Sequence, residues 1–569
     1  MSIWRSPWTR TIAGGLLALL AAGPVLAKAA PTAEPWWKNA VIYEIYPRSF
    51  QDTNGDGIGD LAGITKRLDY IKGLGVDAIW VTPFFPSPNK DFGYDVADYT
   101  GVSREYGTMR DWDVLTREAK KRGIRVLVDL VVNHSSDQHP WFRESRSSRS
   151  NPKRDWYVWK DPAPDGGPPT NWQSIFGGST WEYDKASGQY YYHMFLPQQP
   201  DLNWANPEVR AAMHGVMRFW LRHGASGFRL DATPYLFEDP NWPNDPDVNS
   251  GAPIKLKPYN SALPEGNAAL REMRKVVDAA PGQAILLGES VTASIDDLRK
   301  AYGAKVDEVN LPMNFLYGDL TRLDAKVFKR VIDDAETKLD GLPSVFFFSS
   351  HDHARQWTSF GDGVNNDRIA RLTAAMTLTL RGAALLYYGE EIGMADLPAE
   401  VVKSFPLGPK RKVADNRDPA RSPMQWSAAP NAGFTTGAPW LPVHPNAPAV
   451  NVARQQAEKG SMLAWYRRLL QLRRTDPALR GGRYLPLDSG NPDVVAYARV
   501  ARSGEGMLVL LNMSGQRQTL KIDGWPGRTP RAVSVAMASP AAGAANLVDP
   551  ALEPYAVQLV RFSPASAKR

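Results

Sequence analysis

Two short apolar segments of this chain each end in an acidic residue, and together they could supply a nucleophile and a proton donor. The first, 227–231, carries Arg229 and Asp231, and the second, 284–289, ends in Glu289. Side chains alternate along a strand, so Arg229 and Asp231 would point to the same side. An ionised Asp beside an Arg keeps a low pKa, as a carboxylate nucleophile requires. A buried structural ion pair is the alternative for the first segment alone, but two carboxylates at neighbouring strand ends are the minimum for glycoside hydrolysis.

Further polar residues follow other apolar segments. Asp91 and Tyr94 come after the segment 78–83, His134 comes after 125–133, and His351 and Asp352 come shortly after 344–348. At strand ends such groups could hold a neutral, hydroxyl-rich ligand by hydrogen bonds. A lone histidine is more often structural, which is the simpler role for His134 by itself. Placing a third acid near two others costs free energy unless positive partners or a cationic transition state compensate. The presence of Asp352 therefore favours a functional site over a structural role.

An alternating run of oxygen-bearing residues near the N-terminus has the pattern of a cation loop. In the segment DTNGDGIGD (52–60) every second residue can offer an oxygen, with a glycine at the sixth position. This matches the first nine positions of a calcium loop, in which the seventh ligand is a backbone carbonyl. The closing Glu of an EF-hand is missing. A tight Asp/Gly turn without metal is the alternative. The expected ligands are Asp52, Asn54, Asp56, the carbonyl of Ile58, and Asp60.

The elements that must position these residues alternate in type. From about residue 35, short β-branched or aromatic segments alternate with helical ones such as 209–223 and 462–475, which predicts parallel strands joined by helices. Eight such units predict a closed (β/α)₈ barrel whose functional residues collect at the C-terminal ends of its strands. The expected strands are 41–47, 78–83, 125–133, 227–232, 284–289, 308–314, 344–350 and 383–388.

The spacing of these strands also predicts the domain organisation. The connection after the third strand is far longer than a loop needs, so we expect an inserted domain over residues 134–206. The barrel then comprises 35–133 and 207–481. From residue 482 the helical period ends and apolar runs indicate a C-terminal antiparallel β-sandwich domain over 482–569.

Composition and the N-terminus bear on partners and location. The chain has 569 residues, a formal charge of +7 and no cysteine, which excludes disulfides and thiolate nucleophiles. Its basic residues are scattered, so no nucleic-acid partner is expected. Two arginines, an apolar run and small residues over 1–29 indicate a secretory signal peptide, with an uncleaved membrane anchor as the alternative. We expect an exported protein, periplasmic or extracellular, without stable membrane insertion, acting as a monomer or homodimer on a small oligosaccharide.

Taken together, the motifs resemble those of the α-amylase family of retaining glycoside hydrolases. Within it they are most similar to the α-glucosidase and oligo-1,6-glucosidase branch. The resemblance runs from about residue 36 to the C-terminus, and the ordered series makes it specific. It rests on DLVVNH (129–134), QPDLN (199–203), GFRLD (227–231), GE (288–289), HD (351–352), GEEIGM (389–394) and RDPARSPMQW (417–426).

The resemblance implies a role for each of the residues above. Asp231 would be the nucleophile, Glu289 the general acid/base, and Asp352 the transition-state stabiliser. It also implies a structural calcium or magnesium ion in the loop 52–60. The subsite for the non-reducing glucose would be lined by Asp91, Tyr94, His134, Arg229, His351, Arg417 and Arg421.

This chain departs from the family pattern at two positions, and a third region bears on linkage. Ser350 stands where Asn is usual, and Tyr388 where Gln is usual, which puts subsite detail in question. Relatives with Val after the nucleophile look tuned to α-1,6 bonds, and those with Ala or Thr to α-1,4 bonds. Here Ala232 and Thr233 follow, and a smaller side chain leaves room beside the leaving group, so we expect α-1,4-linked maltose and short maltooligosaccharides.

Other functions stay open at this stage. A transglucosidase, a sucrose isomerase or an oligo-1,6-glucosidase would use the same three acids. A non-catalytic transporter subunit or sugar-binding relative would lack catalytic carboxylates, whereas Asp231, Glu289 and Asp352 are all present. A barrel whose strand-end acids bind a catalytic metal is disfavoured, because here the acids are accompanied by Arg and His.

Overall fold

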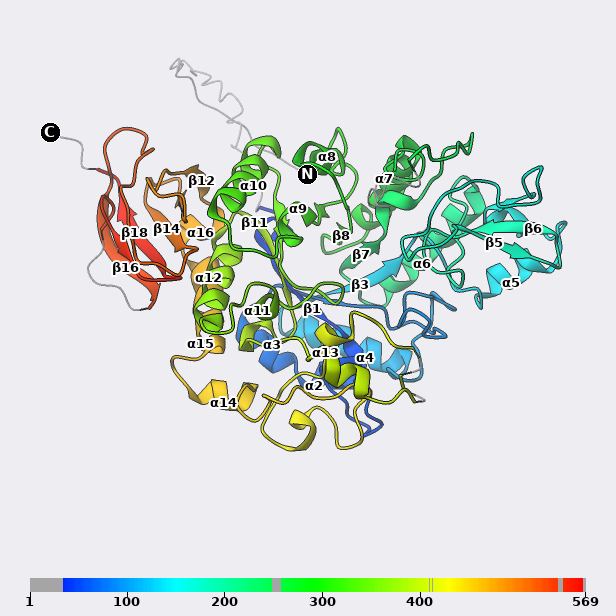
Figure 1. The fold of residues 1–569 in the computed structure, drawn as a ribbon, viewed down its shortest axis with the longest axis horizontal. Helices are drawn as coiled ribbons and strands as arrows, with labels where there is room; N and C mark the ends of the chain where they lie inside the picture. Colours follow the sequence, from blue (N-terminus) through cyan, green and yellow to red (C-terminus); the bar gives the residue numbers. More distant parts are fainter. Residues whose placement is uncertain (1–33, 248–256, 409, 412, 541–545, 566–569) are drawn as a thin grey trace, which may run out of the picture. The chain divides into compact units, whose positions relative to one another are not determined.

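The centre of the molecule is a parallel eight-stranded sheet that closes on itself (Figure 1). A computed structural model describes residues 34–247, 257–408, 410–411, 413–540 and 546–565. The strand order is β10-β11-β1-β2-β3-β7-β8-β9, and a parallel bridge between Met313 and Val345 joins the two ends. The strands are β1 (Val41–Ile45), β2 (Ala78–Val81), β3 (Arg125–Val131), β7 (Gly227–Asp231), β8 (Ile285–Gly288), β9 (Leu311–Pro312), β10 (Ser344–Phe346) and β11 (Gly382–Tyr387).

Strand alternation divides the apolar residues into two cores. Inward positions form a small barrel core that includes Ile42, Leu127 and Leu385, all fully buried. Outward positions such as Tyr43 and Leu386 join a much larger core between the strands and the surrounding helices. Residues two apart on a strand share a face. The inward residue that follows the last apolar inward residue of a strand therefore lies at the mouth of the barrel.

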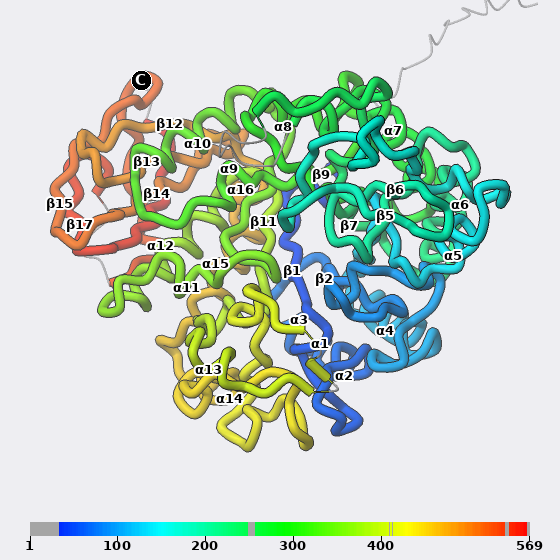
Figure 2. Tube along the Cα trace, turned by 45° about the vertical axis from the view of Figure 1, so that its right-hand side comes forward, coloured from blue at the N-terminus to red at the C-terminus, as the bar shows by residue number. Residues whose placement is uncertain are grey.

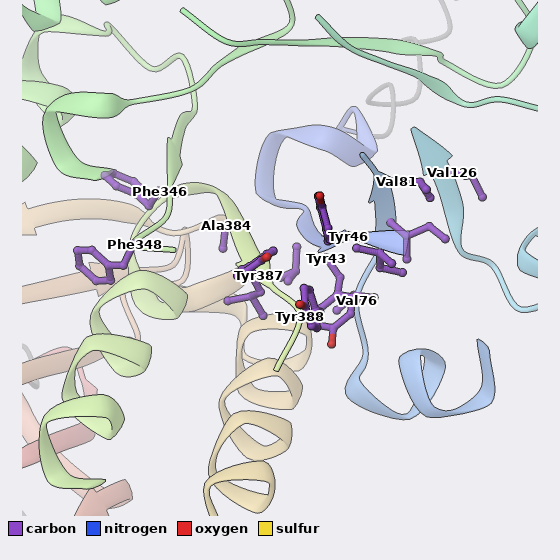
Figure 3. Packing of buried hydrophobic residues seen from close by; sticks show 14 of the residues in the cluster. Tyr43, Tyr46, Val76, Val81, Val126, Phe346, Phe348, Ala384, Tyr387 and Tyr388 are labelled. Carbon is purple, nitrogen blue, oxygen red and sulfur yellow. The ribbon is translucent and has the colours of Figure 1, made fainter. Parts of the chain in front are cut away.

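Aromatic side chains fill part of the outer core. Figure 3 shows Tyr43 of β1 close to Tyr387 and Tyr388 at the end of β11. The rings of Tyr387 and Tyr388 meet edge to face with their centroids 4.6 Å apart. The Tyr43 hydroxyl donates to Glu391 at 2.9 Å, so this core also satisfies a buried acid.

Sixteen α-helices are described, and several of the longer ones begin where the sequence supplies a cap. Asn206 accepts from the Glu208 amide at the start of α6, and Asp324 and Ser461 cap α10 and α15 in the same way. The helices are α1 (Pro47–Phe50), α2 (Leu61–Lys66), α3 (Leu68–Leu74), α4 (Met109–Lys121), α5 (Pro140–Ser147), α6 (Pro207–Arg222), α7 (Pro264–Asp278), α8 (Ile295–Lys300), α9 (Phe315–Gly318), α10 (Ala325–Lys338), α11 (Gln356–Ser359), α12 (Asn366–Thr379), α13 (Ala399–Ser404), α14 (Val452–Ala457), α15 (Met462–Thr475) and α16 (Pro477–Gly481).

The segment between β3 and β7 carries a sheet of its own. Three short antiparallel strands, β4 (Trp159–Lys160), β5 (Trp181–Asp184) and β6 (Gln189–Tyr192), pair in the order β4-β6-β5. An isolated bridge between His134 and Asp201 ties the end of the segment to the residues that follow β3. The insertion is therefore anchored at the mouth of the barrel.

A second antiparallel sheet follows α16 near the C-terminus (orange to red in Figure 2). Its order is β12-β13-β14-β18-β16, and β15 pairs with β17 in a separate two-stranded sheet. Apolar residues from both sheets, including Leu508 and Leu552, form one core. The strands are β12 (Arg483–Pro486), β13 (Val494–Val500), β14 (Gly506–Asn512), β15 (Gln518–Thr519), β16 (Arg531–Ser539), β17 (Ala551–Leu552) and β18 (Val557–Ser563).

The barrel with an insertion and a C-terminal antiparallel sheet confirms the expected fold class. All eight expected segments contain a barrel strand, but the strands at 308–314 and 344–350 shorten to two and three residues, β9 and β10. The domain boundaries remain predictions. The expected signal peptide lies outside the described residues. No helix in the described part is long and apolar enough to span a bilayer.

Close packing at the start of β7 generates a stability prediction. Gly227 has φ +138°, and a Cβ there would lie 2.3 Å from the Ile285 carbonyl oxygen of β8. Gly227→Ala should therefore cost roughly 3 kcal/mol of unfolding free energy. Gly215→Ala is the matched control, because Gly215 lies in α6 with open space around its Cβ, and it should be neutral or stabilising. Thermal unfolding measures both, and equal melting temperatures would contradict the packing.

Candidate active site

Four charged side chains converge at the mouth of the barrel from three adjacent strands. Arg229 is 2% exposed and contacts Asp129 of β3 at 3.1 Å, Asp231 of its own strand at 2.5 Å and Glu289 at 2.8 Å. Strand pairing explains this meeting, since Asp129 lies opposite Arg229 in the β3–β7 register. Asp231 is the next inward position after Arg229, and Glu289 follows β8, where its amide donates to the Leu230 carbonyl.

One guanidinium therefore holds the two predicted catalytic acids. Asp231 contacts Nη1 of Arg229 and Glu289 contacts Nη2. Because the guanidinium fork is rigid, the contacting carboxylate oxygens lie no more than about 8 Å apart. Glu289 also accepts the backbone N–H of Ala232 at 2.9 Å, which fixes its orientation towards β7. The roughly 5 to 5.5 Å separation of a retaining enzyme stays a prediction within this bound.

Burial changes the electrostatics expected for the nucleophile. Removal from water raises the pKa of Asp231 well above its ordinary value, and the charges of Glu289 and Asp129 add to this rise, while Arg229 opposes it. The expectation that Arg229 alone would keep the pKa of Asp231 low is therefore wrong for the free protein. Burial also raises the pKa of Asp129. With three carboxyl groups around one cation, the cluster has a tendency to retain a proton.

Asp352 has the opposite environment. Its Oδ1 accepts from Arg417 at 2.9 Å and from Arg421 at 3.1 Å, and its Oδ2 lies 2.9 Å from His351 Nε2. Burial alone would raise the pKa of Asp352, but the charges of His351, Arg417 and Arg421 outweigh it and hold the pKa well below its usual range. Asp352 is thus a permanent carboxylate at neutral pH, as a stabiliser of developing positive charge must be.

His351 is a buried cation within this network. Its Nδ1 lies 2.7 Å from Glu44, and its Nε2 lies 2.6 Å from the Tyr94 hydroxyl, which donates to Asp129 at 2.9 Å. Burial opposes the charge, but Asp352 and Glu44 raise the pKa of His351 to about 9. The network links both groups of acids through Tyr94.

A second series of polar contacts connects the insertion to Arg417 of the site. Asp91 pairs with Arg417 at 2.5 Å and accepts from Gln199 at 3.1 Å. The same Gln199 amide lies 3.1 Å from His134 Nε2. Burial lowers the pKa of His134 to about 3, so this histidine is neutral at physiological pH. Gln199 belongs to the segment inserted between β3 and β7, so the insertion contributes directly to the site.

These groups surround a cavity of about 240 Å³. Its polar lining includes Arg229, Glu289, His351, Asp352 and Arg417. Its apolar lining includes Phe176, Phe195 and Phe315. The other predicted site residues do not form its walls. Four of them contact a lining residue: Asp231 contacts Arg229, Tyr94 contacts His351, Asp91 contacts Arg417, and Arg421 contacts Asp352. His134 instead contacts Gln199, which does not line the cavity.

Sequence reasoning assigned no role to Glu44, Asp129 or Asp415, which complete the network. Glu44 and Asp129 are fully buried acids inside apolar strands, and an acid within such a strand is the signal that could have identified them. Asp415 accepts from Arg417 at 2.6 Å and lies in an irregular segment, where no comparable signal exists.

The two departures from the family pattern both make local contacts. The Ser350 hydroxyl bonds His353 at 2.8 Å and accepts the Asp352 amide at 3.1 Å, so it shapes the turn that presents Asp352. The Tyr388 hydroxyl donates to the Ser422 carbonyl at 2.6 Å, beneath the segment carrying Arg417 and Arg421. Ser350 also lines the cavity, whereas Tyr388 does not.

The predicted cation loop is built by successive side-chain to backbone bonds. Asp52 accepts the amide of Asn54 at 2.9 Å, Asn54 that of Asp56 at 2.8 Å, and Asp56 that of Ile58 at 2.8 Å. Asp60 caps α2 through the Gly63 amide. Carboxylate, amide and carbonyl oxygens suit Ca²⁺ or Mg²⁺. No group of three or more His, Cys, Asp or Glu side chains in the described part has a metal-binding arrangement, so an ion here would also need the amide and carbonyl oxygens.

Comparison with known proteins places the geometry in a family context. Residues 44–482 match the model of the alpha amylase catalytic domain. The chain is 41% identical to a probable alpha-glucosidase of Rhizobium meliloti, over 86% of this chain and 91% of that protein. It is 39% identical to an oligo-1,6-glucosidase of Heyndrickxia coagulans, over 84% and 92%. The trehalulose synthase of Pseudomonas mesoacidophila superposes with a TM-score of 0.84 at 37% identity, covering 93% of this chain and all of that one.

The charge on His351 generates a pH prediction. Its folded pKa of about 9 lies above the ordinary 6.5, so its contribution to stability is complete below pH 6.5 and is lost as the pH rises through about 9. The full contribution is about 3 kcal/mol, because each pKa unit corresponds to about 1.4 kcal/mol. Denaturant unfolding from pH 6 to 10 measures it. The wild type should lose stability over this window and His351→Gln should not, whereas parallel curves would contradict a charged His351.

Proposed function

The chain belongs to the α-amylase family of glycoside hydrolases, and from this premise we propose that it is an exo-acting α-glucosidase. It would release terminal non-reducing glucose from maltose and short oligosaccharides, with α-1,4 bonds favoured, by a retaining double displacement. The observation that carries the proposal is the joint attachment of Asp231 and Glu289 to one buried guanidinium. Such a pair can attack and protonate at the same glycosidic bond.

Each acid has a distinct part in the proposed reaction. When the proton retained by the cluster lies on Glu289, Asp231 is ionised. Glu289 then donates this proton to the leaving oxygen while Asp231 attacks the anomeric carbon and forms a glucosyl ester. Water then attacks this ester, and Glu289, now a base, accepts its proton. Arg229 keeps both acids in place, and Asp352 offers a fixed negative charge to the oxocarbenium-like transition state.

The small volume of the cavity supports exo action. Arg417, which lines the cavity, forms an ion pair with Asp91, and Gln199 of the insertion bonds to Asp91. A cavity of about 240 Å³ suits one sugar ring better than a chain passing through. A terminal glucose would be recognised by hydrogen bonds to these charged groups.

The linkage preference rests on the residues after the nucleophile. Ala232 lines the cavity with a left-handed backbone (φ +52°), and its amide bonds Glu289. The small side chain leaves room for the leaving group beside the proton donor, which favours the α-1,4 bond.

Glucosyl transfer is the second candidate function. The likeness to a trehalulose synthase supports it, and Phe176 and Phe195 line the cavity with apolar surface that could shield the ester from water. The acids would act in the same way, with a sugar hydroxyl replacing water as the acceptor.

Three further proposals accompany the catalytic one. We propose that Asp52, Asn54, Asp56, Ile58 and Asp60 hold a structural Ca²⁺ or Mg²⁺ ion that stabilises the loop after α1. Export to the periplasm or the medium, and a monomeric or homodimeric state, stay predictions from the sequence.

Replacement of Asp231 tests its role as the nucleophile. Asp231→Ala should lower kcat by more than about 10³-fold, because no other group can form the glucosyl ester. Its fold should persist, since burial and two neighbouring acids already disfavour a charge at this position. Release of p-nitrophenol from p-nitrophenyl α-glucoside measures turnover, and circular dichroism checks folding. Activity within tenfold of the wild type would refute the assignment.

The linkage proposal is tested by comparing maltose with isomaltose. We expect kcat/KM to be higher for maltose, by about threefold or more. Ala232→Val should shift the ratio towards isomaltose, because the added methyl groups narrow the space beside Glu289. A strong isomaltose preference of the wild type would overturn the proposal.

Removal of the ion tests the loop. A chelator should lower the melting temperature by several degrees, since an ion that binds only the folded state stabilises it. Asp56→Ala should abolish this response, while Asp165→Ala, in an exposed loop of the insertion, should retain it. No effect of the chelator on the wild type would exclude a structural ion.

A further inference from the structure

A second cavity adjoins the first behind the turn that follows the nucleophile. It has a volume of about 370 Å³ and is formed by this turn, the start of α7, the residues after β8, and α8. Pro234 and Val291 line both cavities, so the two spaces meet at these residues. Nothing in the reaction described above uses this second space.

The lining of the second cavity is hydroxyl-rich and electrically balanced. Four residues with hydroxyl side chains line it, Thr233, Ser261, Ser290 and Thr292, beside apolar prolines, leucines and alanines. The Thr233 and Ser261 hydroxyls donate to the backbone carbonyls of Glu289 and Lys257. The Thr292 hydroxyl is shielded from water and has no hydrogen-bond partner among the described residues. This hydroxyl is closed off from the cavity as well as from bulk water, so a ligand would reach it only after rotation of the Thr292 side chain.

The charges on the wall cancel each other. Asp297 and Lys300 are its only ionisable lining residues in the described part, and they pair with each other at 2.7 Å. A cavity without net charge gives no advantage to a phosphate or a carboxylate. Hydroxyl groups with interspersed apolar surface instead match a neutral sugar ring, which has polar edges and apolar faces.

A direct contact connects this cavity to the proton donor. The Thr233 hydroxyl, on the cavity wall, donates to the Glu289 backbone carbonyl at 2.7 Å and lies 3.4 Å from the Ser290 hydroxyl. A ligand that competes for the Thr233 hydroxyl, or holds it, would alter how firmly Glu289 is positioned. The neighbouring Ala232 amide bonds the Glu289 carboxylate itself.

We propose that the cavity behind Thr233 is a second sugar site, which takes one neutral hexose ring and acts on the reaction through the contact between Thr233 and Glu289. The inference rests on the proposed α-glucosidase function for its substrate class. The ring could be the far end of a longer substrate or a free sugar molecule.

Labelling of a single thiol tests occupancy without turnover. The chain has no cysteine, so Asn267→Cys, on the cavity wall, carries a unique thiol. In a Glu289→Gln background, the rate of modification by a small methanethiosulfonate is measured with methyl α-glucoside or maltotetraose present. Ser503→Cys in an exposed turn of the C-terminal sheet is the matched control.

We expect saturable protection of the Asn267→Cys thiol by at least threefold, and none for Ser503→Cys. Protection by methyl α-glucoside identifies a free-sugar site, and protection by maltotetraose alone identifies the far end of the substrate. If neither sugar protects at concentrations well above the wild-type KM, the proposal is wrong. Failure of the wild type to cleave any α-glucoside would instead refute the proposed function.

Filling the cavity gives an independent measurement. A Cβ on Gly266, which lines the cavity from α7, would meet only ordinary contacts near 3.9 Å, so Gly266→Ala is a tolerated control. Gly266→Phe should occupy the space. Relative to Gly266→Ala, it should lower kcat/KM for maltotetraose at least threefold if the cavity holds the far end of the substrate. If the cavity holds a free sugar, it should abolish the effect of free glucose on the rate. In either case, hydrolysis of an aryl α-glucoside without added sugar should change less than twofold. Equal behaviour of both variants would overturn the proposal.

Discussion

The whole site depends on one buried cation. Arg229 is surrounded by Asp129, Asp231 and Glu289, and no other cation contacts these three acids among the described residues. Burying charges is costly unless they pair closely, so the three adjacent strands must keep a register that brings every acid to this guanidinium. Because this cation does not fully balance three carboxyls, the cluster can hold the proton that the leaving group needs. The same interaction thus secures the fold of the barrel mouth and its chemistry.

Strand periodicity explains how much of this arrangement could be predicted. Arg229 and Asp231 are two residues apart on one strand, so a shared face followed from alternation alone. The order of the strands and the convergence of Glu289 required the eight-unit pattern of the barrel. The ends of elements were harder to predict: β10 ends four residues earlier than expected, at Phe346, and β9 pairs over Leu311–Pro312 only. Glu44 was missed because its partner, His351, is distant in sequence. Asp415 lies close in sequence to its partners Arg417 and Arg421, but in an irregular segment without a periodic pattern.

Electrostatic details depend on burial, which a sequence does not give. The pKa of Asp231 rises although Arg229 is adjacent, since removal from water and two acids outweigh one cation. His351 is charged and His134 is neutral, yet both follow apolar strands in the sequence. The difference arises from their neighbours, as two carboxylates contact His351 and an amide contacts His134. The junction of the two cavities is likewise a tertiary feature, because Pro234 and Val291 lie far apart in the chain.

The central claim is that Asp231, held by Arg229, forms a covalent bond to glucose while Glu289 manages the proton. The most direct measurement is to trap this intermediate with 5-fluoro-α-glucosyl fluoride, which slows hydrolysis of the ester, and to locate the added mass by peptide mass spectrometry. The account predicts one glucosyl group per chain, on the peptide that contains Asp231. An adduct on Glu289 or Asp352, or rapid turnover of the reagent with inversion and no adduct, would contradict it.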